Sequence, residues 1–566
     1  MKKLIWLHHL SLWCHSLAFC CHPFSYMNRS CDGCATKKPY QSLSATLNND
    51  RNATPDNDSW NYNTTWEHLM KQLATEALVP VLYPPNTNGK PALDNLRNTP
   101  SGTIDAERAL KKLLGKYQKL TSTSNTTLEE RQASRKMLAD LVIGTSVMRL
   151  FHYHSLVSTT QSDYHGLSIH DIEPIYGVTK DYNYNIIDTC HEKRLKVVGA
   201  MVDMHSKYIK NQSNAPDIQN SPIPCAFRFN TSAERISTLY SLPLFFVEML
   251  IDQYGEHLTE QMTKVFNEPG PITIRRNRIK CSSDEFLTTR LFQENNISTE
   301  RLFDGCIRLL VNDLWSPSKT SLWSLQSWKD GWFEIQDSGS QLIVKATEAN
   351  VNDRIVVDYC AGNGGKTLAL ASELYRNDHS DESMAIRNTS DTLIIAHDIV
   401  EERMRQLKGS LERVGLGKDA IDTCNVTIKT TLDKDISLCE GMADLVLVDA
   451  PCSSSGVLRR RPSQRFLLDK HEMQHDFPKL QSSILKEASR LVKVGGKLVY
   501  STCSISHFEN EDVVKNFERS CHEFGDNWQR WQFHDEESPT YSHFKTLLPN
   551  MHGSDGFFIA RWKRIR

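Results

Sequence analysis

The chain lacks a strong net charge, because 66 Lys and Arg residues nearly balance 68 Asp and Glu residues. A formal net charge of −2 excludes a global basic field, so a nucleic-acid partner must be held by local patches. The chain also lacks the dense cysteine spacing of a small disulfide scaffold, since its 15 cysteines are scattered over 566 residues. That distribution indicates a reducing compartment. Cys31 and Cys34 form a lone Cys-x-x-Cys pattern with no second pair, so no metal site is predicted.

The first residues lack an unbroken apolar stretch of the length that a membrane-spanning helix needs. The apolar run from Leu4 to Cys21 is interrupted by histidines and serines, which argues against an anchor. Lys2 and Lys3 precede the run, and no acidic residue occurs before Asp32, a pattern typical of a cleavable targeting segment. We therefore expect import into an organelle, a plastid or a mitochondrion, with cytoplasm or nucleus as the alternative. The mature form is expected to have no membrane partner.

The length of the chain predicts several domains, because a single hydrophobic core does not grow to 566 residues. Asn, Ser, Thr and Asp dominate residues 41–66, and such a composition cannot bury enough apolar surface to fold. The patterns divide the chain into a targeting segment and linker at 1–66, a helical domain with an irregular insertion at 67–235, a small α+β RNA-binding module at 236–345, and a catalytic domain at 346–566.

Strand-like and helix-like runs alternate regularly in the last of these regions. The predicted strands are 355–359, 393–397, 426–429, 445–448 and 498–501, and the predicted helices are 367–375, 401–414 and 480–492. Such alternation predicts an α/β fold with a doubly wound, mostly parallel sheet of the Rossmann-like kind. In these sheets ligands bind beyond the carboxyl ends of the strands, and every motif described next follows a strand.

A glycine-rich turn follows the first predicted strand, at residues 360–366. Glycines let the backbone approach a ligand closely, and the start of the next helix offers free N–H groups. The end of the turn, Gly365-Lys366-Thr367, also fits a phosphate-binding P-loop. That alternative requires glycine at position 360, where Cys360 stands.

An acidic residue, Asp398, ends the second predicted strand. A carboxylate at this place can accept hydrogen bonds from a ribose diol, although many such residues are helix caps. Arg403 follows about one helical turn later. The register of Asp398 with the glycine-rich turn favours a ligand contact over the role of a helix cap.

Two cysteines each follow a late strand, Cys452 in Asp-Ala-Pro-Cys-Ser and Cys503 in Tyr-Ser-Thr-Cys-Ser. Either cysteine alone would favour packing, because buried cysteine is common in cores. Two cysteines beside a glycine-rich turn instead favour chemistry on a pyrimidine. The C5 carbon of cytosine becomes a nucleophile only after a thiolate has added to C6, and a second cysteine can assist release. Asp449 is placed to hold the cytosine edge while charge develops.

These motifs, together with residues 548–558 near the C-terminus, closely resemble those of the Sun/Fmu family of RNA cytosine-C5 methyltransferases. The similarity spans about residues 241–566. The helical part from about Ile104 is more loosely similar to the NusB-like domain of the bacterial ribosomal-RNA enzymes of that family.

The resemblance implies S-adenosylmethionine as the cofactor and assigns roles to the motif residues. Cys503 would be the nucleophile, Cys452 would help release the product, and Asp449 would face both cofactor and cytosine. The implied cofactor-binding residues are Cys360, Ala361, Gly362, Asn363, Gly364, Gly365, Lys366, Asp398, Arg403 and Asp449. Two departures stand out: Asn363 replaces the usual proline, and Thr430 and Thr431 occupy the place of the acidic residue that contacts adenine.

Two clusters of cations are predicted to bind RNA phosphates, although a solvated surface is the ordinary role of either. The predicted RNA-binding residues are Arg275, Arg276, Asn277, Arg460 and Arg461. Ribosomal RNA is the expected substrate and transfer RNA the alternative, and the chain is expected to act as a monomer. A catalytically inactive RNA-binding assembly factor is a further alternative, against which the intact cysteine pair argues.

Overall fold

The computed structural model of the chain describes its C-terminal part almost throughout. The described residues are 229–268, 270–310, 322–375, 392–417, 426–431, 436–524, 528–533 and 542–566, with scattered helical residues between 70 and 206. The predicted targeting segment, the linker and most of the predicted helical domain lie outside them. In the described part, no helix has the length and apolar character needed to cross a membrane.

Three short helices begin the continuous part: α10 (Ser232–Tyr240), α11 (Leu244–Tyr254) and α12 (Glu256–Phe266). The Thr231 side chain accepts a hydrogen bond from the N–H of Glu234, which caps α10. Apolar side chains of all three helices pack into one cluster with Ile505 and Leu548. Tyr254 in α11 donates a hydrogen bond of 2.7 Å to the Ile505 carbonyl. This bundle therefore docks against the turn that follows the Cys503 strand.

A small α+β unit follows the three helices. Its antiparallel sheet has the order β2-β3-β1-β4. Its elements are β1 (Thr273–Arg276), α13 (Asp284–Asn295), β2 (Thr299–Phe303), β3 (Cys306–Leu309), η4 (Leu322–Ser324), α14 (Gln326–Lys329) and β4 (Phe333–Ile335). Leu287 and Leu291 of α13 pack on the buried faces of β1 and β3 to form the core of the unit.

The main sheet has eight strands, with the order β10-β12-β9-β8-β5-β6-β7 and β11 paired to β12. The strands are β5 (Ile355–Asp358), β6 (Thr392–His397), β7 (Val426–Thr431), β8 (Ala443–Asp449), β9 (Val492–Thr502), β10 (Trp528–Arg530), β11 (Phe544–Leu547) and β12 (Phe557–Arg564). Strands β5 to β9 pair in parallel, and β12 is antiparallel to β9. The predicted doubly wound, mostly parallel sheet is confirmed.

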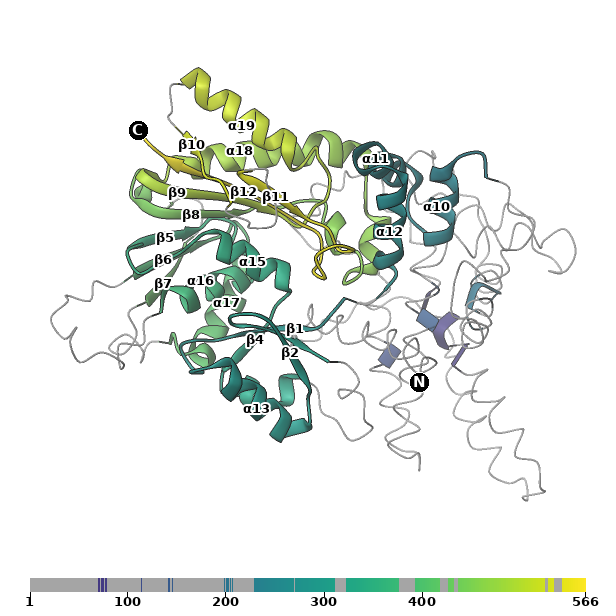
Figure 1. Cartoon of the computed structure of the whole chain (residues 1–566), viewed down its shortest axis with the longest axis horizontal. Coiled ribbons are helices and arrows are strands. Elements are labelled where there is room, and N and C mark those ends of the chain that lie inside the picture. Colours follow the sequence, from purple (N-terminus) through teal and green to yellow (C-terminus); the bar gives the residue numbers. More distant parts are fainter. Residues whose placement is uncertain are drawn as a thin grey trace, which may run out of the picture.

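Helices cover both faces of this sheet (Figure 1). On one face lie α15 (Ser338–Ala346), α16 (Gly365–Leu374) and α17 (Glu401–Val414), and on the other lie α18 (Phe477–Ser489) and α19 (Glu511–Phe524). Shorter turns are η8 (Ile436–Cys439), η9 (Ser455–Val457), η10 (Pro462–Phe466) and η11 (Glu472–Asp476).

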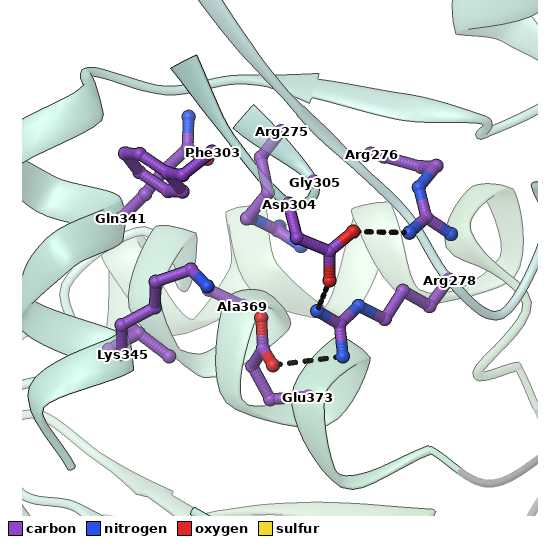
Figure 2. A pocket seen from close by; sticks show the side chains of 11 residues that line it. Arg275, Arg276, Arg278, Phe303, Asp304, Gly305, Gln341, Lys345, Ala369 and Glu373 are labelled. Carbon is purple, nitrogen blue, oxygen red and sulfur yellow. Dashed lines mark hydrogen bonds and ion pairs between the residues drawn. The ribbon is translucent and has the colours of Figure 1, made fainter. Parts of the chain in front are cut away.

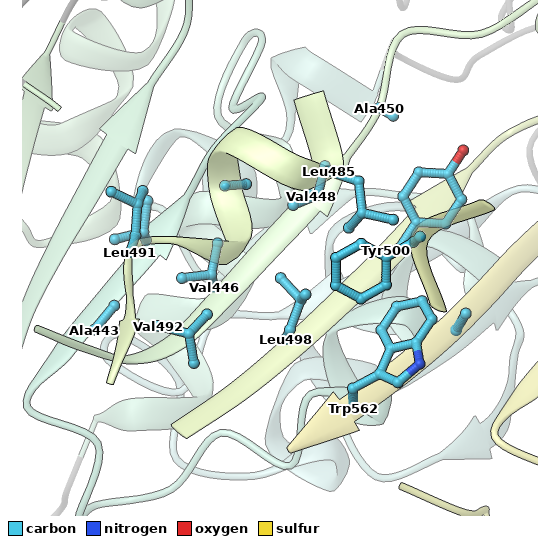
Figure 3. Close-up of a cluster of buried hydrophobic side chains, with 14 of the residues drawn as sticks. Ala443, Val446, Val448, Ala450, Leu485, Leu491, Val492, Leu498, Tyr500 and Trp562 are labelled. Carbon is cyan, nitrogen blue, oxygen red and sulfur yellow. The ribbon is translucent and has the colours of Figure 1, made fainter. Parts of the chain in front are cut away.

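Continuous apolar runs in β8 and β9 fit strands that are buried on both faces. Val446 and Leu498 pack under α18, and Tyr500 and Trp562 extend this core toward α19 (Figure 3). The register pairs Asp449 with Ser501. The core therefore fixes the two strand ends that carry the cysteine motifs beside each other.

Candidate functional site

The carboxyl ends of the parallel strands bring the predicted motifs together at one edge of the sheet. Parallel pairing sets β5 between β6 and β8, and β8 beside β9. The glycine-rich turn after β5, Asp398 after β6 and the two cysteine loops after β8 and β9 therefore share this edge. This is where a sheet of this type binds its ligands.

The glycine-rich turn shows two distinct uses of glycine. Gly364 has a φ of 86°, and a Cβ there would lie 2.4 Å from Leu407 Cδ1, so the turn packs tightly against α17. Gly362 has a φ of 56°, but a Cβ there would meet no atom within 4 Å. No side chain caps the start of α16 at Gly364, so its first N–H groups can receive an anionic ligand group.

Asp398 lies against the turn, as its register predicted. Its carboxylate accepts hydrogen bonds from the N–H groups of Gly362 at 2.9 Å and Val400 at 2.8 Å. Arg403 Nη1 is 3.7 Å from the same carboxylate. Asp398 thus links the turn to β6, and its remaining lone pairs suit the predicted ribose contact.

Asp358, at the end of β5, is a residue to which the sequence analysis gave no role. Its side chain is fully buried, and Thr367 donates a hydrogen bond of 2.7 Å to Oδ2. Among the described residues Oδ1 has no hydrogen-bond partner. Burial raises the pKa of Asp358 to about 7, and the Thr367 hydrogen bond opposes that rise. An unsatisfied acceptor beneath the turn fits a cationic amino group. In the sequence, the only indication of a role for Asp358 was its position as an acidic residue directly before the glycine-rich turn.

Lys366 and Asp449 form an ion pair across the site. The Nζ of Lys366 is 2.6 Å from Asp449 Oδ2, and the Ser501 hydroxyl donates to Oδ1 at 3.0 Å. Burial alone would lower the pKa of Lys366, but the Asp449 carboxylate raises it above its usual value. Lys366 was predicted to hold the cofactor, and the structure adds an ion pair with the carboxylate at the centre of the site.

The two cysteines meet at the same place. Their Sγ atoms are 3.2 Å apart, and Cys503 Sγ lies 3.4 Å from the hydroxyl of Ser454. The hydrogen bond with Cys452 lowers the pKa of Cys503, burial opposes this, and Ser454 supports it. The same hydrogen bond raises the pKa of Cys452, with burial as the next cause. These opposite directions favour Cys503 over Cys452 as the thiol of the pair that ionises first.

Ser454 was also missed by the sequence analysis. It adopts a left-handed backbone conformation, with a φ of 59° that non-glycine residues rarely take. Residues held in such conformations cluster at functional sites. Here the conformation places a hydroxyl beside the predicted nucleophile, and its sequence signal was no more than its position two residues after Cys452.

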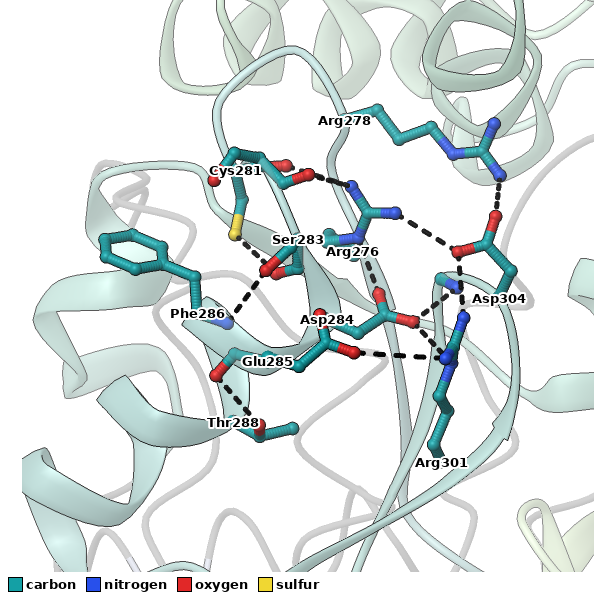
Figure 4. Close-up of polar contacts among 12 residues, drawn as sticks. Arg276, Arg278, Cys281, Ser283, Asp284, Glu285, Phe286, Thr288, Arg301 and Asp304 are labelled. Carbon is teal, nitrogen blue, oxygen red and sulfur yellow. Dashed lines mark hydrogen bonds and ion pairs between the residues drawn. The ribbon is translucent and has the colours of Figure 1, made fainter.

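The first predicted RNA-binding cluster is used inside the protein. Arg276 is buried and bonds Asp284 at 2.6 Å and Asp304 at 3.3 Å (Figure 4). Asn277 donates to the carbonyls of Gly331 and Val414. These buried groups cannot reach an RNA phosphate without unfolding their surroundings, so their placement does not support the predicted contact.

Arg275 is buried too, and its Nε donates to Gln336 at 2.8 Å. Burial lowers the pKa of Arg275 to about 10. Its side chain lines a hollow of about 10 Å³ beside Asp304 and Glu373 (Figure 2). That volume suits a water molecule rather than a phosphate group. The predicted contact of Arg275 with RNA is likewise not supported.

The second cluster divides between two environments. Arg460 is largely buried and bonds the carboxylates of Asp555 and Asp337. Arg461 is exposed, and its positive charge is among the causes that lower the pKa of Cys503. Of the five predicted RNA-binding residues, Arg461 is therefore the one that the structure presents to solvent beside the thiols.

No group of His, Cys, Asp and Glu side chains that could hold a metal ion occurs in the described ranges. The described site consists of a glycine-rich turn, three carboxylates, a lysine and two paired thiols.

Comparison with known proteins relates this arrangement to a known family. Residues 346–563 match the family described as 16S rRNA methyltransferase RsmB/F. This part of the chain is similar to the proteins of that family. The resemblance to the Sun/Fmu family that the motifs indicated is confirmed.

Relatives of the RsmB/F domain extend the match toward the N-terminus. The probable ribosomal RNA small subunit methyltransferase B of Bacillus subtilis is 27% identical over 350 residues, which cover 61% of this chain and 72% of the relative. The 28S rRNA (cytosine-C(5))-methyltransferase of Mus musculus is 27% identical over 345 residues, 58% of this chain and 40% of that protein. The crystal structure of PH0851 superposes with a TM-score of 0.57 at 19% identity, covering 87% of this chain and 99% of the other, which shows a shared fold.

Proposed function

We propose that this chain is an S-adenosylmethionine-dependent methyltransferase that methylates C5 of cytosines in ribosomal RNA. The family match and the names of the relatives support the reaction and the RNA class. The observation that carries the proposal is the cysteine pair, with Sγ atoms 3.2 Å apart beside the Lys366–Asp449 ion pair.

The residues at the sheet edge fit the cofactor. Residues 360–366 and Asp398 would hold it, with the unpartnered Oδ1 of Asp358 suited to its amino group. When bound, S-adenosylmethionine supplies an electrophilic methyl group.

The chain's own residues account for activation of the cytosine. The Cys503 thiolate forms a bond to C6, and the electron pair of the C5–C6 double bond becomes available at C5. Asp449 would bind the N3/N4 edge of the base, a role supported by the ion pair through which Lys366 holds that carboxylate in place. Methylation of C5 consumes this electron pair.

Release requires the reverse of the addition. A base removes the C5 proton, the electron pair of the C5–H bond restores the ring double bond, and the Sγ–C6 bond breaks to return the Cys503 thiolate. Cys452, in contact with Cys503, is the residue placed to assist this step. Since C6 is stacked within a helix, the target cytosine must be unpaired or flipped out. The exposed Arg461 is proposed to contact a phosphate of that strand.

The test compares the two cysteine variants on the small-subunit and large-subunit ribosomal RNA of cells that lack the protein. Cys503→Ala is expected to abolish methyl transfer, because no thiolate can add to C6. Cys452→Ala is expected to retain RNA as an adduct that survives denaturation, because release fails. Normal turnover by Cys503→Ala would refute the assignment of roles.

The substrate follows from bisulfite sequencing of ribosomal and transfer RNA in the presence and absence of the gene. We expect a cytosine in ribosomal RNA to lose its methyl group, in an organelle if the N-terminal segment directs import. A lost methyl group in transfer RNA alone would overturn the substrate class and leave the chemistry standing.

A further inference from the structure

A buried carboxylate lies directly beneath the cysteine pair and is used by no step described above. Glu509 is fully buried in the turn between β9 and α19. It is attached to both cysteine loops through the residue that follows each cysteine, Ser453 and Ser504.

Four hydrogen bonds converge on this carboxylate. Oε2 accepts the N–H of Ser453 at 2.8 Å and the side-chain amide of Gln481 at 3.1 Å. Oε1 accepts the hydroxyls of Ser453 at 2.5 Å and Ser504 at 2.7 Å. Both partners of Oε2 are N–H groups that can only donate, so this oxygen cannot carry a proton. Burial raises the pKa of Glu509, and the hydrogen bonds from Ser453, Ser504 and Gln481 oppose that rise. The donors therefore stabilise the ionised form of the carboxylate.

The turn that carries Glu509 is held rigidly. Asn510 accepts a hydrogen bond from Thr502 at 2.6 Å and donates one to the Ser504 carbonyl at 2.9 Å. Tyr500 donates to the backbone carbonyl of Glu509 at 2.7 Å. The carboxylate is therefore fixed relative to β9, and through Ser453 it fixes the loop that follows β8.

We propose that Glu509 is a positioning residue that sets the separation of the two thiols and, by its negative charge, keeps the shared proton on Cys452. The inference rests on the proposed function, because it explains why Cys503 attacks and Cys452 does not. It names a determinant of the reaction that lies outside the motifs which identified the site.

The charges around the thiols agree with this role. The pKa of Cys452 is raised by its hydrogen bond with Cys503, by burial, and by the negative charges of Cys503 and Glu509. Cys503 is instead subject to the opposing charges of Asp449 and Arg461. Among the described residues, the titratable or charged groups that interact electrostatically with the two thiols are Lys366, Asp449, Arg461, Tyr500 and Glu509.

The experiment uses Glu509→Gln in the full-length chain, which keeps the size of the side chain and removes its charge. The matched control is Glu511→Gln, two residues later, whose carboxylate lies 3.8 Å from His507. In a Cys503→Ser background, alkylation of Cys452 by iodoacetamide is followed against pH by peptide mass spectrometry. This readout needs neither RNA nor methyl transfer, so it separates the inference from the proposed function.

The expected result is that Glu509→Gln moves the alkylation midpoint of Cys452 about one pH unit lower, because the thiolate loses a negative neighbour. Methyl transfer in the parent background should fall about tenfold or more, because the loops lose a fixed anchor. Glu511→Gln should change neither value. A Cys452 profile in Glu509→Gln that coincides with that of the control would overturn the proposal.

A second variant keeps the test decisive if Glu509→Gln does not fold. Ser504→Ala removes one donor from Oε1 and leaves the charge of Glu509 in place. It should slow methyl transfer without lowering the alkylation midpoint of Cys452. Methyl transfer at the full rate in Ser504→Ala would contradict the positioning role.

Discussion

The edge of the main sheet and the α+β unit both carry residues that the sequence marked as functional, and the structure treats them in opposite ways. At the sheet edge the marked side chains converge. Lys366 contacts the Asp449 carboxylate, and the thiols of Cys452 and Cys503 contact each other. In the α+β unit the marked arginines are buried, Arg276 against carboxylates of its own domain and Arg275 against the side-chain amide of Gln336. Charge density in a sequence therefore says little about function until the partners of each charge are known.

The largest effect should come from the centre of the sheet edge. Asp449→Asn removes the carboxylate that Lys366 and Ser501 hold in place. Methyl transfer should fall about 100- to 1000-fold, the usual cost of losing one group that stabilises developing charge. Single-turnover assays measure it, and the thermal midpoint of unfolding serves as the control. A loss below tenfold would remove Asp449 from the mechanism.

The α+β unit should respond through stability. Arg276→Ala leaves Asp284 buried without its inner partner and should lower the free energy of unfolding by about 3–5 kcal/mol. Arg301→Ala removes a half-exposed arginine from the same carboxylate and should cost less than about 1 kcal/mol. Urea denaturation followed by tryptophan fluorescence distinguishes the two. Equal losses, or a stable Arg276→Ala variant that fails to bind RNA, would restore the predicted role of Arg276 in RNA binding.

Asp358 should make stability depend on pH in an unusual direction. Because burial raises its pKa in the folded state to about 7, the folded protein binds the proton more tightly than the unfolded chain does. Its contribution to stability is therefore present below about pH 4 and is lost as the pH rises toward 7, on the order of 4 kcal/mol at most.

Asp358→Asn should remove the decrease in the free energy of unfolding with rising pH. Unfolding titrations between pH 4 and 8 measure this decrease. Asp444 is the matched control, because hydrogen bonds from Lys493 and two backbone N–H groups outweigh burial and lower its pKa. Its contribution is present above about pH 4 and is lost as the pH falls further. A fall with rising pH that persists in Asp358→Asn would contradict the assignment.

The smallest effect is expected at Arg461, the exposed member of the second cluster. Arg461→Gln should raise the alkylation midpoint of Cys503 by less than about half a pH unit, because solvent screens an exposed charge. It should also weaken RNA binding and reduce the salt dependence of that binding. Arg460→Gln should instead destabilise the fold, because it leaves Asp555 and Asp337 without a buried partner. If Arg461→Gln and Arg460→Gln had the same effects on RNA binding and on stability, the assignment of Arg461 to RNA and of Arg460 to the fold would be wrong.

The sequence predicted the parts of this site that depend on local pattern. Apolar runs ending in Asp398, Asp449 and Thr502 marked strand ends, and the parallel order of strands brought those ends together. Glycines at 362 and 364 marked the turn through backbone conformations that other residues rarely adopt.

What the sequence could not predict depends on contacts between distant segments. Arg460 meets Asp555 from 95 residues away, and Glu509 reaches Ser453 across 56 residues. No local sequence pattern predicts such pairs. The buried arginines were therefore predicted to contact RNA, and no role was predicted for Glu509. The ion pair of Lys366 with Asp449, which lies 83 residues further along the chain, was not predicted for the same reason.

The most direct test of the account is the chemical identity of the RNA adduct that Cys452→Ala retains. After digestion of the denatured complex, mass spectrometry should find a methylated cytosine attached to the peptide that contains Cys503. An adduct on any other residue, or release of unmodified RNA with no adduct formed, would contradict the claim that the Cys503 sulfur attacks the pyrimidine ring.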